Sequence, residues 1–289
     1  MQQRSVVAIG FALALLAAGP GAHAAELPGS GVASPKANAE DDLTIRPTVL
    51  IRQGRTVGSG TIIASVAGET LVLTASHVVN GREPIVVELH RYNLGREAEP
   101  AAAGARPMAV KGDRVGDDRH GDVAVVRIRG MRALPYVARL TAGDEEPAQG
   151  SKVTSVGIDL ATNLSRWSTT MRGVAWLDMT QKEEERPFLV TTKAPEHGRS
   201  GGGLYQDALL IGVCVGRAEF DEGRTRGVFA GASNIRLVLQ ERGLMDLIAQ
   251  SEQIPLADRS ASFRRGEIAP GARRIVPVPT AAGSRSHGR

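Results

Sequence analysis

Short apolar or alternating runs, separated by clusters of Gly, Asp, Asn and Pro, recur along the chain from residue 48 to residue 232. Such spacing is typical of antiparallel all-β proteins, and it predicts a sandwich or a barrel. Aromatic residues make up only 3% of the sequence, so Val, Leu, Ile and Ala must fill the core. The branched side chains of Val and Ile pack well on a pleated sheet, which favours the same fold class. The predicted strands lie within residues 48–51, 60–64, 70–74, 85–89, 122–128, 152–156, 173–177, 188–192, 209–215 and 227–232.

The N-terminus has the parts of a secretory signal peptide. Arg4 precedes an apolar run over residues 6–18, Pro20 breaks that run, and Ala-His-Ala at residues 22–24 is a small-x-small cleavage site. The run is shorter than the roughly 20 residues that cross a bilayer, which favours cleavage over a membrane anchor. We therefore expect a signal peptide over residues 1–24, no membrane span after its removal, and an exported protein, either periplasmic or extracellular.

The sequence contains one cysteine, Cys214, which excludes an internal disulfide framework. Cys214 lies in the apolar run 208–215. A free cysteine in such a run is more often a small buried residue than a reactive thiol, so we expect a buried strand residue here.

Segments of low apolar content flank the predicted domain. Residues 25–43 are small and polar with Pro and Gly, as in a flexible lead-in. Residues 44–250 carry the strands, a surface loop over residues 91–106, and a C-terminal helix with Ser233 as its N-cap and Gly243 ending or bending it. The apolar positions of that helix share one face; they are Ile235, Val238, Leu239, Met245 and Ile248.

Residues 251–289 are rich in Pro, Gly, Ser and Arg, which predicts a disordered basic tail. Much of the net charge of +4 and the sequence pI near 9.6 comes from this tail. The charge is therefore weak support for nucleic-acid binding, and we expect no nucleic-acid partner. No spacing of Cys, His and Asp resembles a metal site.

A serine surrounded by glycines is the first candidate catalytic residue, in the stretch Gly198-Arg199-Ser200-Gly201-Gly202. The glycines allow a tight turn and close approach of a substrate carbonyl, and the amides of Gly198 and Ser200 can face a developing oxyanion. A serine hydroxyl needs a neighbouring base to become a nucleophile. Taken alone, the stretch fits an ordinary glycine-rich loop equally well.

His77 is the candidate base, because it follows the apolar run that begins at Leu71 through the small residues Ala75 and Ser76. Taken alone, it fits a histidine at the edge of the core equally well. Asp122 immediately precedes a predicted strand and would orient His77 and stabilise its imidazolium. The alternatives for this role are Asp117 and Asp118, which we place in the preceding loop.

The order His77, Asp122, Ser200 is one of several unrelated chain orders that build the same triad. Three further stretches accompany it: the strand from Gly58 to Ile63, the Asp-x-Ala-Val stretch from Asp122, and the Gly-x-x-Val-x-x-x-Gly stretch at residues 150–157. With these motifs, residues 44–248 resemble the trypsin-like peptidases of the chymotrypsin fold, and more closely the bacterial HtrA (Deg) branch. The resemblance implies two six-stranded antiparallel barrels with the triad in the cleft between them.

The chain departs from that pattern at several positions. Arg199 stands where digestive trypsins carry an aspartate that pairs with a freed N-terminus, so activation of that kind is not expected. Ala194 stands where the family often places the floor of the primary pocket, which implies a neutral pocket for an aliphatic side chain, with Gly216 lining it. The residues after the domain are too few for the PDZ domain of the HtrA branch.

The resemblance implies a serine endopeptidase that acts on proteins or peptides through an acyl-enzyme and uses no cofactor. One alternative is a latent or non-catalytic binding or sensor protein, in which Arg199 and His197 stabilise a collapsed oxyanion loop. Another is an acyl hydrolase acting on non-peptide substrates. Relatives often form trimers, and the sequence leaves a monomer and a homo-oligomer both open.

Overall fold

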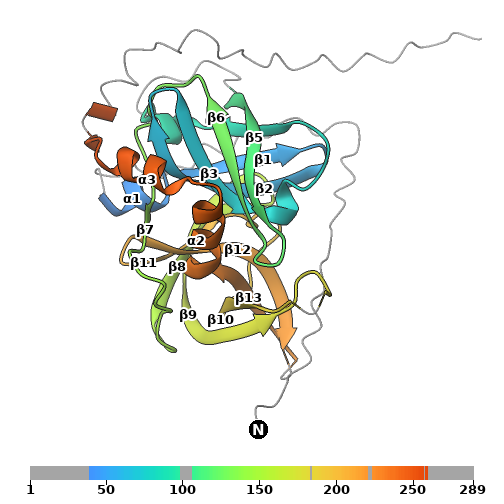
Figure 1. The fold of residues 1–289 in the computed structure, drawn as a ribbon. Coiled ribbons are helices and arrows are strands. Elements are labelled where there is room, and N and C mark those ends of the chain that lie inside the picture. The colour runs from blue at the N-terminus through green and yellow to red at the C-terminus, as the bar shows by residue number, and fades with distance from the viewer. Residues whose placement is uncertain (1–38, 98–105, 183, 221–222, 257, 260–289) are drawn as a thin grey trace, which may run out of the picture.

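The computed structural model describes residues 39–97, 106–182, 184–220, 223–256 and 258–259. The predicted signal peptide, most of the predicted lead-in and the tail from residue 260 lie outside the described residues. The chain forms two β-barrels, one above the other in Figure 1, with two C-terminal helices along one side.

The first barrel is closed and antiparallel, with its strands in the order β1-β2-β3-β6-β5-β4. Its inward side chains are aliphatic, such as Ile62, Val72 and Val126, all fully buried. This is the core that the scarcity of aromatic residues predicts. The strands are β1 (Thr48–Gln53), β2 (Thr56–Val66), β3 (Glu69–Ala75), β4 (Ile85–Leu89), β5 (Met108–Asp118) and β6 (Val123–Arg129).

The second barrel is a seven-stranded sheet in the order β11-β8-β9-β10-β13-β12-β7. Because β11 also pairs with β12, the six antiparallel strands close on themselves, and β7 adds to β12 as a short parallel strand. The predicted all-β fold of two six-stranded barrels is confirmed. The strands are β7 (Arg139–Leu140), β8 (Lys152–Asp159), β9 (Asn163–Leu177), β10 (Arg186–Thr191), β11 (Gly203–Gln206), β12 (Leu209–Phe220) and β13 (Arg224–Gly231).

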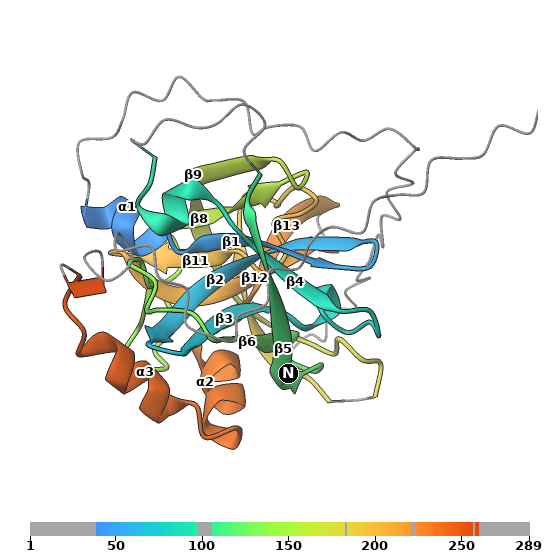
Figure 2. The same ribbon diagram turned by 90° about the horizontal axis from the view of Figure 1, so that it is seen from above.

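The predicted C-terminal helix is two helices, α2 (Ala232–Glu241) and α3 (Met245–Glu252). Gly243 lies between them with a φ of 60°, a conformation that ends a helix. The prediction of Ser233 as N-cap is wrong: the N-cap is Gly231, whose extended backbone at the end of β13 leads directly into α2. α2 packs against β5 and β6 of the first barrel and β12 and β13 of the second, so it bridges the two (Figures 1 and 2).

Three boundaries differ from the sequence predictions. The helix α1 (Ala39–Thr44) begins inside the predicted lead-in. The 3-10 helix η2 (Arg91–Leu94) occupies the start of the predicted loop 91–106, of which residues 98–105 lie outside the described residues. Arg259, in the predicted tail, is only 5% exposed and donates hydrogen bonds to the carbonyl oxygens of Ser65 and Ile254.

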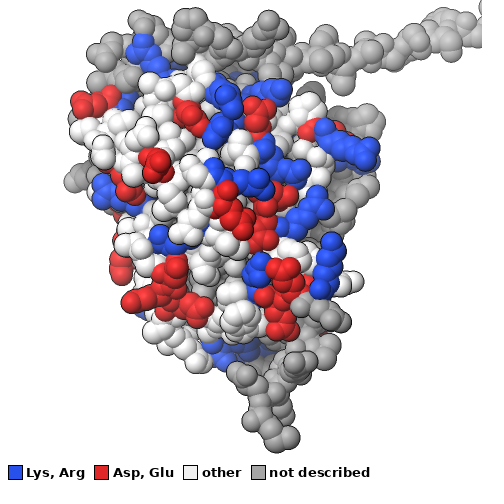
Figure 3. Space-filling model, in the orientation of Figure 1, with Lys and Arg blue, Asp and Glu red and all other residues white. Residues whose placement is uncertain are grey.

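Acidic and basic side chains are intermingled over the face that carries α2 and α3 (Figure 3). Within the described ranges, every helix is too short or too polar to cross a lipid bilayer.

Candidate active site

His77 lies in the one-turn 3-10 helix η1 (Ser76–Val78), directly after β3. Its Nδ1 is 2.7 Å from Oδ2 of Asp122, and its backbone N–H donates to Oδ1 of the same carboxylate at 2.9 Å. Asp122 is 4% exposed, and its carbonyl accepts from the N–H of Ser76 at 3.1 Å. The φ of Asp122 is 50°, a left-handed conformation that Asp tolerates better than most residues. One residue therefore fixes both the backbone and the ring of His77.

The position of Asp122 also sets the charge state of His77. Burial of the imidazole lowers its pKa, but the negative charge of Asp122 and the hydrogen bond to it together outweigh burial. The pKa of His77 is therefore raised above its ordinary value of 6.5.

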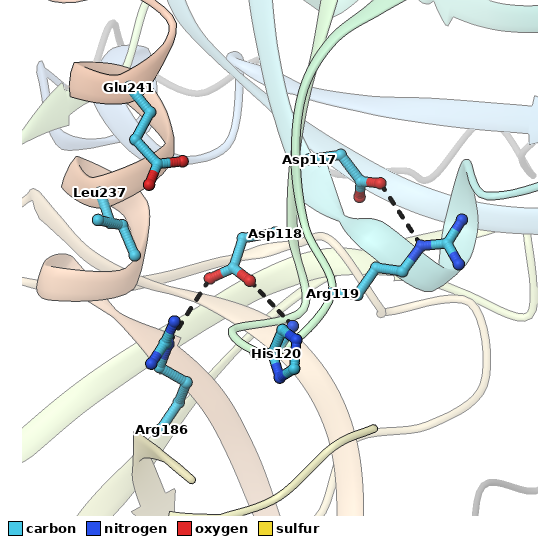
Figure 4. Close-up of a pocket in the computed structure, with 7 residues that line it drawn as sticks. All are labelled: Asp117, Asp118, Arg119, His120, Arg186, Leu237 and Glu241. Atoms are coloured by element: carbon cyan, nitrogen blue, oxygen red, sulfur yellow. Dashed lines mark hydrogen bonds and ion pairs between the residues drawn. The ribbon is translucent and has the colours of Figure 1, made fainter. Parts of the chain in front are cut away.

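The rival carboxylates Asp117 and Asp118 lie in β5, not in a loop, and each has another partner. Asp117 accepts from the hydroxyl of Ser76 and lies 3.4 Å from the guanidinium of Arg114. Asp118 accepts from the backbone N–H of His120 at 2.9 Å and faces Arg186, as Figure 4 shows. These contacts stabilise the turn that ends at Asp122.

A charged cavity of about 300 Å³ lies between that turn and α2 (Figure 4). The imidazole of His120 lies 3.1 Å from the Thr180 hydroxyl and 3.4 Å from Glu184. The lining residues are Asp117, Asp118, Arg119, His120, Arg186, Leu237 and Glu241.

Ser200 lies in the turn between β10 and β11, where the second barrel meets the first. Its carbonyl accepts from the N–H of Ser59 on β2 at 2.7 Å. A Cβ on Gly58 would lie 2.9 Å from that carbonyl oxygen and 2.6 Å from Val78, the residue after His77. The turn of Ser200 therefore packs beside the turn of His77. The Ser200 hydroxyl donates to the carbonyl of Val215 at 3.1 Å.

The amides of Gly198 and Ser200 have orientations set by the carbonyls that precede them. The His197 carbonyl accepts from the N–H of Leu160 at 2.6 Å, and the Arg199 carbonyl accepts from the N–H of Gly202 at 2.8 Å. In a trans peptide the C=O and N–H point in opposite directions. The two amides therefore point away from these partners, and among the described residues no backbone carbonyl accepts from either amide.

Two glycines in this turn occupy positions where a side chain does not fit. Gly198 has a φ of 88°, and a Cβ there would lie 2.8 Å from the carbonyl oxygen of Ile158. Gly201 has a φ of 87°, and a Cβ there would overlap the Ser59 carbonyl oxygen and the Thr74 hydroxyl. The Gly-x-Ser-Gly pattern thus has a steric cause: Gly198 packs against β8, and Gly201 packs against β2 and β3.

Arg199 is fully buried beside an acidic partner that the sequence did not predict. Its Nε lies 2.8 Å from Oδ1 of Asp159, and one terminal nitrogen lies 2.7 Å from Oδ2, a bidentate pair. The hydroxyl of Ser165 also donates to Asp159 at 2.6 Å, and the guanidinium lies 4.8 Å from the ring centroid of Trp167. The sequence offers one signal for this pair. Asp159 lies shortly after the predicted strand 152–156, and Arg199 lies in the turn that carries Ser200.

The predicted pocket residues come from the chain segments before and after the Ser200 turn. Ala194 is half-buried after β10, and Gly216, with a φ of 157°, faces open space on β12. His197 is half-buried, and its Nε2 lies 3.1 Å from the guanidinium of Arg217. Cys214 is fully buried in β12, as predicted, and burial raises the pKa of its thiol to about 12. In the described part of the chain, no three side chains of His, Cys, Asp or Glu gather as a metal site would require.

Comparison with known proteins places the chain in a family. The family model of the trypsin-like peptidase domain matches residues 58–216, more than half of the chain. No curated protein sequence matches significantly.

Solved structures share the fold. The Rv3671c protease from M. tuberculosis, in its active form, is 24% identical with a TM-score of 0.56, over 71% of this chain and 85% of that chain. The inactive form of its serine-to-alanine mutant is 23% identical with a TM-score of 0.54, over 72% and 91%. The HtrA-type protease AlgW with a tripeptide is 19% identical with a TM-score of 0.53, over 70% and 62%. The chain belongs to the trypsin-like peptidase family and has the chymotrypsin-type fold of these serine proteases.

Proposed function

We propose that this chain is an exported serine endopeptidase that hydrolyses peptide bonds through an acyl-enzyme on Ser200. The observation that carries the proposal is the pairing of His77 with the buried Asp122 beside the turn of Ser200. The proposal needs no cofactor, and its substrates are proteins or peptides. Export, to the periplasm or beyond the cell, rests on the sequence of residues 1–24.

In this mechanism Ser200 Oγ attacks the substrate carbonyl carbon while Nε2 of His77 takes the hydroxyl proton. Asp122 keeps the proton of His77 on Nδ1 and stabilises the imidazolium that forms. The amides of Gly198 and Ser200 donate to the oxyanion. His77 then protonates the leaving amine, which breaks the peptide bond, and water repeats the same steps to release the acid and restore Ser200.

We propose a neutral primary pocket in which Ala194 forms the floor and Gly216 the wall, since neither residue carries a charge. An aliphatic substrate side chain would bury its surface there, and a charged one would lose hydration without a partner. Profiling of cleavage sites in a peptide mixture tests this preference: enrichment of Lys, Arg, Asp or Glu before the cut would contradict it.

A second candidate function is a latent or non-catalytic binding protein. The observation that favours it is the hydrogen bond from the Ser200 hydroxyl to the Val215 carbonyl, which engages the hydroxyl proton. The orientation of the Gly198 and Ser200 amides favours the peptidase, because both N–H groups point away from the partners of the preceding carbonyls. In a collapsed loop, a carbonyl would instead point toward the proposed oxyanion position.

Labelling with a fluorophosphonate probe separates the two candidates. The chain from residue 25 is compared with Ser200→Ala, His77→Ala and the control Ser168→Ala, which changes an exposed serine on β9. The peptidase proposal expects labelling and peptide cleavage in the wild type and the control only. A folded wild type that neither labels nor cleaves would support the binding protein, and cleavage of simple esters but not peptides would support an acyl hydrolase.

A further inference from the structure

We propose that the β8–β9 turn, residues 159–162, clamps the oxyanion loop in its open form, and that Arg199 is the positioning residue through which it acts. This inference rests on the proposed peptidase function. The clamp has two attachments from adjacent residues of one turn. Asp159 binds the guanidinium of Arg199 through both carboxylate oxygens, and the N–H of Leu160 binds the carbonyl of His197 at 2.6 Å.

The two attachments hold the loop on both sides of Gly198. The bond from Leu160 sets the His197–Gly198 peptide, and therefore the direction of the Gly198 amide. The Asp159 pair anchors the residue between Gly198 and Ser200, so it limits rotation of the Arg199–Ser200 peptide. Both proposed oxyanion donors thus depend on one turn of a neighbouring hairpin.

The backbone of that turn is unusual for its sequence. Leu160 and Ala161 have φ values of 52° and 62°. β-Turns with positive φ at both central positions usually contain Asn, Asp or Gly, which tolerate this conformation. Here the turn lies against the loop: a Cβ on Gly198 would be 3.0 Å from the backbone nitrogens of both residues. Strained backbone that persists beside a reactive turn is typical of a site that needs a fixed geometry.

The ion pair is also well enclosed. Arg199 is fully buried, and its remaining donors meet Ser155 at 3.2 Å and the Ser165 hydroxyl, while Trp167 covers one face of the guanidinium. A planar guanidinium held by a bidentate carboxylate has little freedom to reorient. Because the chain itself supplies both charges, the clamp holds the loop without a charge from a newly cut chain end.

Two substitutions weaken the clamp and leave the triad intact. Asp159→Asn removes the charge that holds Arg199, and the milder Ser165→Ala removes only the hydroxyl that donates to Asp159. The matched control is Arg127→Gln, which breaks the 2.6 Å pair between Arg127 and Glu69 on the outside of the first barrel. The measurements are kcat and KM on a cleaved peptide, the pH profile of kcat/KM, and the thermal midpoint of each variant.

We expect Asp159→Asn to lower kcat by about 10–100-fold, because misplacing an oxyanion donor destabilises the transition state. KM should change by less than about 3-fold, since ground-state binding does not use that interaction. The pH midpoint of kcat/KM should not move, because His77 and Asp122 are untouched. Ser165→Ala should lower kcat less, and Arg127→Gln should leave it unchanged.

The outcomes separate this inference from the function on which it rests. A wild type without Ser200-dependent turnover would overturn the proposed function. An active wild type with unchanged kcat in Asp159→Asn would overturn the clamp. A lowered thermal midpoint in that variant would then show that the pair is purely structural. If Asp159→Asn does not fold, Ser165→Ala decides: an unchanged kcat in that variant overturns the clamp.

Discussion

Replacing Asp122 with Asn tests the proposed catalytic machinery most directly, because the change keeps the shape of the side chain and removes only its charge and one acceptor. The carboxylate now makes two hydrogen bonds, to the N–H and to Nδ1 of His77. An Asn amide can keep its oxygen on the N–H only by turning its NH₂ group toward Nδ1. Nδ1 must then accept, the proton moves to Nε2, and His77 can no longer take the proton of Ser200.

The size of the effect follows from these two bonds. Turning the amide the other way restores the useful tautomer but leaves the N–H of His77 without an acceptor, at a cost of about 1–3 kcal/mol. The imidazolium also loses a charged hydrogen bond in the transition state, which costs about 2–3 kcal/mol more. The sum of about 3–6 kcal/mol corresponds to a fall of roughly 10²–10⁴ in kcat/KM at 1.36 kcal/mol per tenfold.

The assay is the second-order rate of fluorophosphonate labelling, measured with kcat/KM on a cleaved peptide. Asp117→Asn tests the rival carboxylate and should lower either rate by less than about tenfold, because Asp117 contacts Ser76 and Arg114 and not the ring of His77. Asp113→Asn, at an exposed position of β5, is the control and should match the wild type. Equal losses in Asp117→Asn and Asp122→Asn, or none in Asp122→Asn, would refute the reasoning.

Three further predictions concern other parts of the structure. Because the pKa of His77 is raised, kcat/KM should rise with pH through a midpoint above 6.5, and a kinetic midpoint below 6.5 would contradict the pairing. The His77–Asp122 pair should stabilise the fold fully below about pH 6.5 and lose that contribution as pH rises through the raised pKa of His77. Gly201→Ala should abolish labelling and lower the thermal midpoint by about 4–8 °C. The reason is that left-handed backbone strain and overlap with the Ser59 carbonyl together cost at least about 2 kcal/mol. Normal labelling of this variant would refute the packing of the turn. Truncation after Glu252 should lower the thermal midpoint relative to truncation after Arg259, because buried hydrogen bonds from Arg259 to Ser65 and Ser251 are lost; equal midpoints would show that the described residues after α3 add no stability.

The sequence was most informative where short-range pattern and structure coincide. The strand that precedes His77 and the strand that follows Asp122 are almost wholly buried and read as continuous apolar runs. β5 was missed because its side chains are mostly half-exposed and charged, and a register shift between Arg114 and Gly116 breaks its alternation. Its partners on both sides, rather than its own composition, make it a strand.

The contacts that sequence reading missed share a physical cause: each joins residues far apart in the chain through charge or hydrogen bonds rather than through apolar periodicity. Arg199 and Asp159 are 40 positions apart, and Arg259 and Ser65 are 194 apart. The composition around Arg259 indicates disorder, yet a guanidinium with several carbonyl partners is stable when buried. Desolvation lowers the pKa of Arg259, and the carbonyl contacts offset part of that cost.

The same reasoning explains why the oxyanion loop is the part of the candidate site least open to prediction. His77 and Ser200 are recognisable from their neighbours, because small residues and glycines are required beside them. The direction of the Gly198 amide depends instead on Leu160, an exposed apolar residue in a left-handed turn, which no turn signal in the sequence predicts. The proposed clamp would therefore place control of the oxyanion loop in a hairpin whose sequence shows no sign of that role.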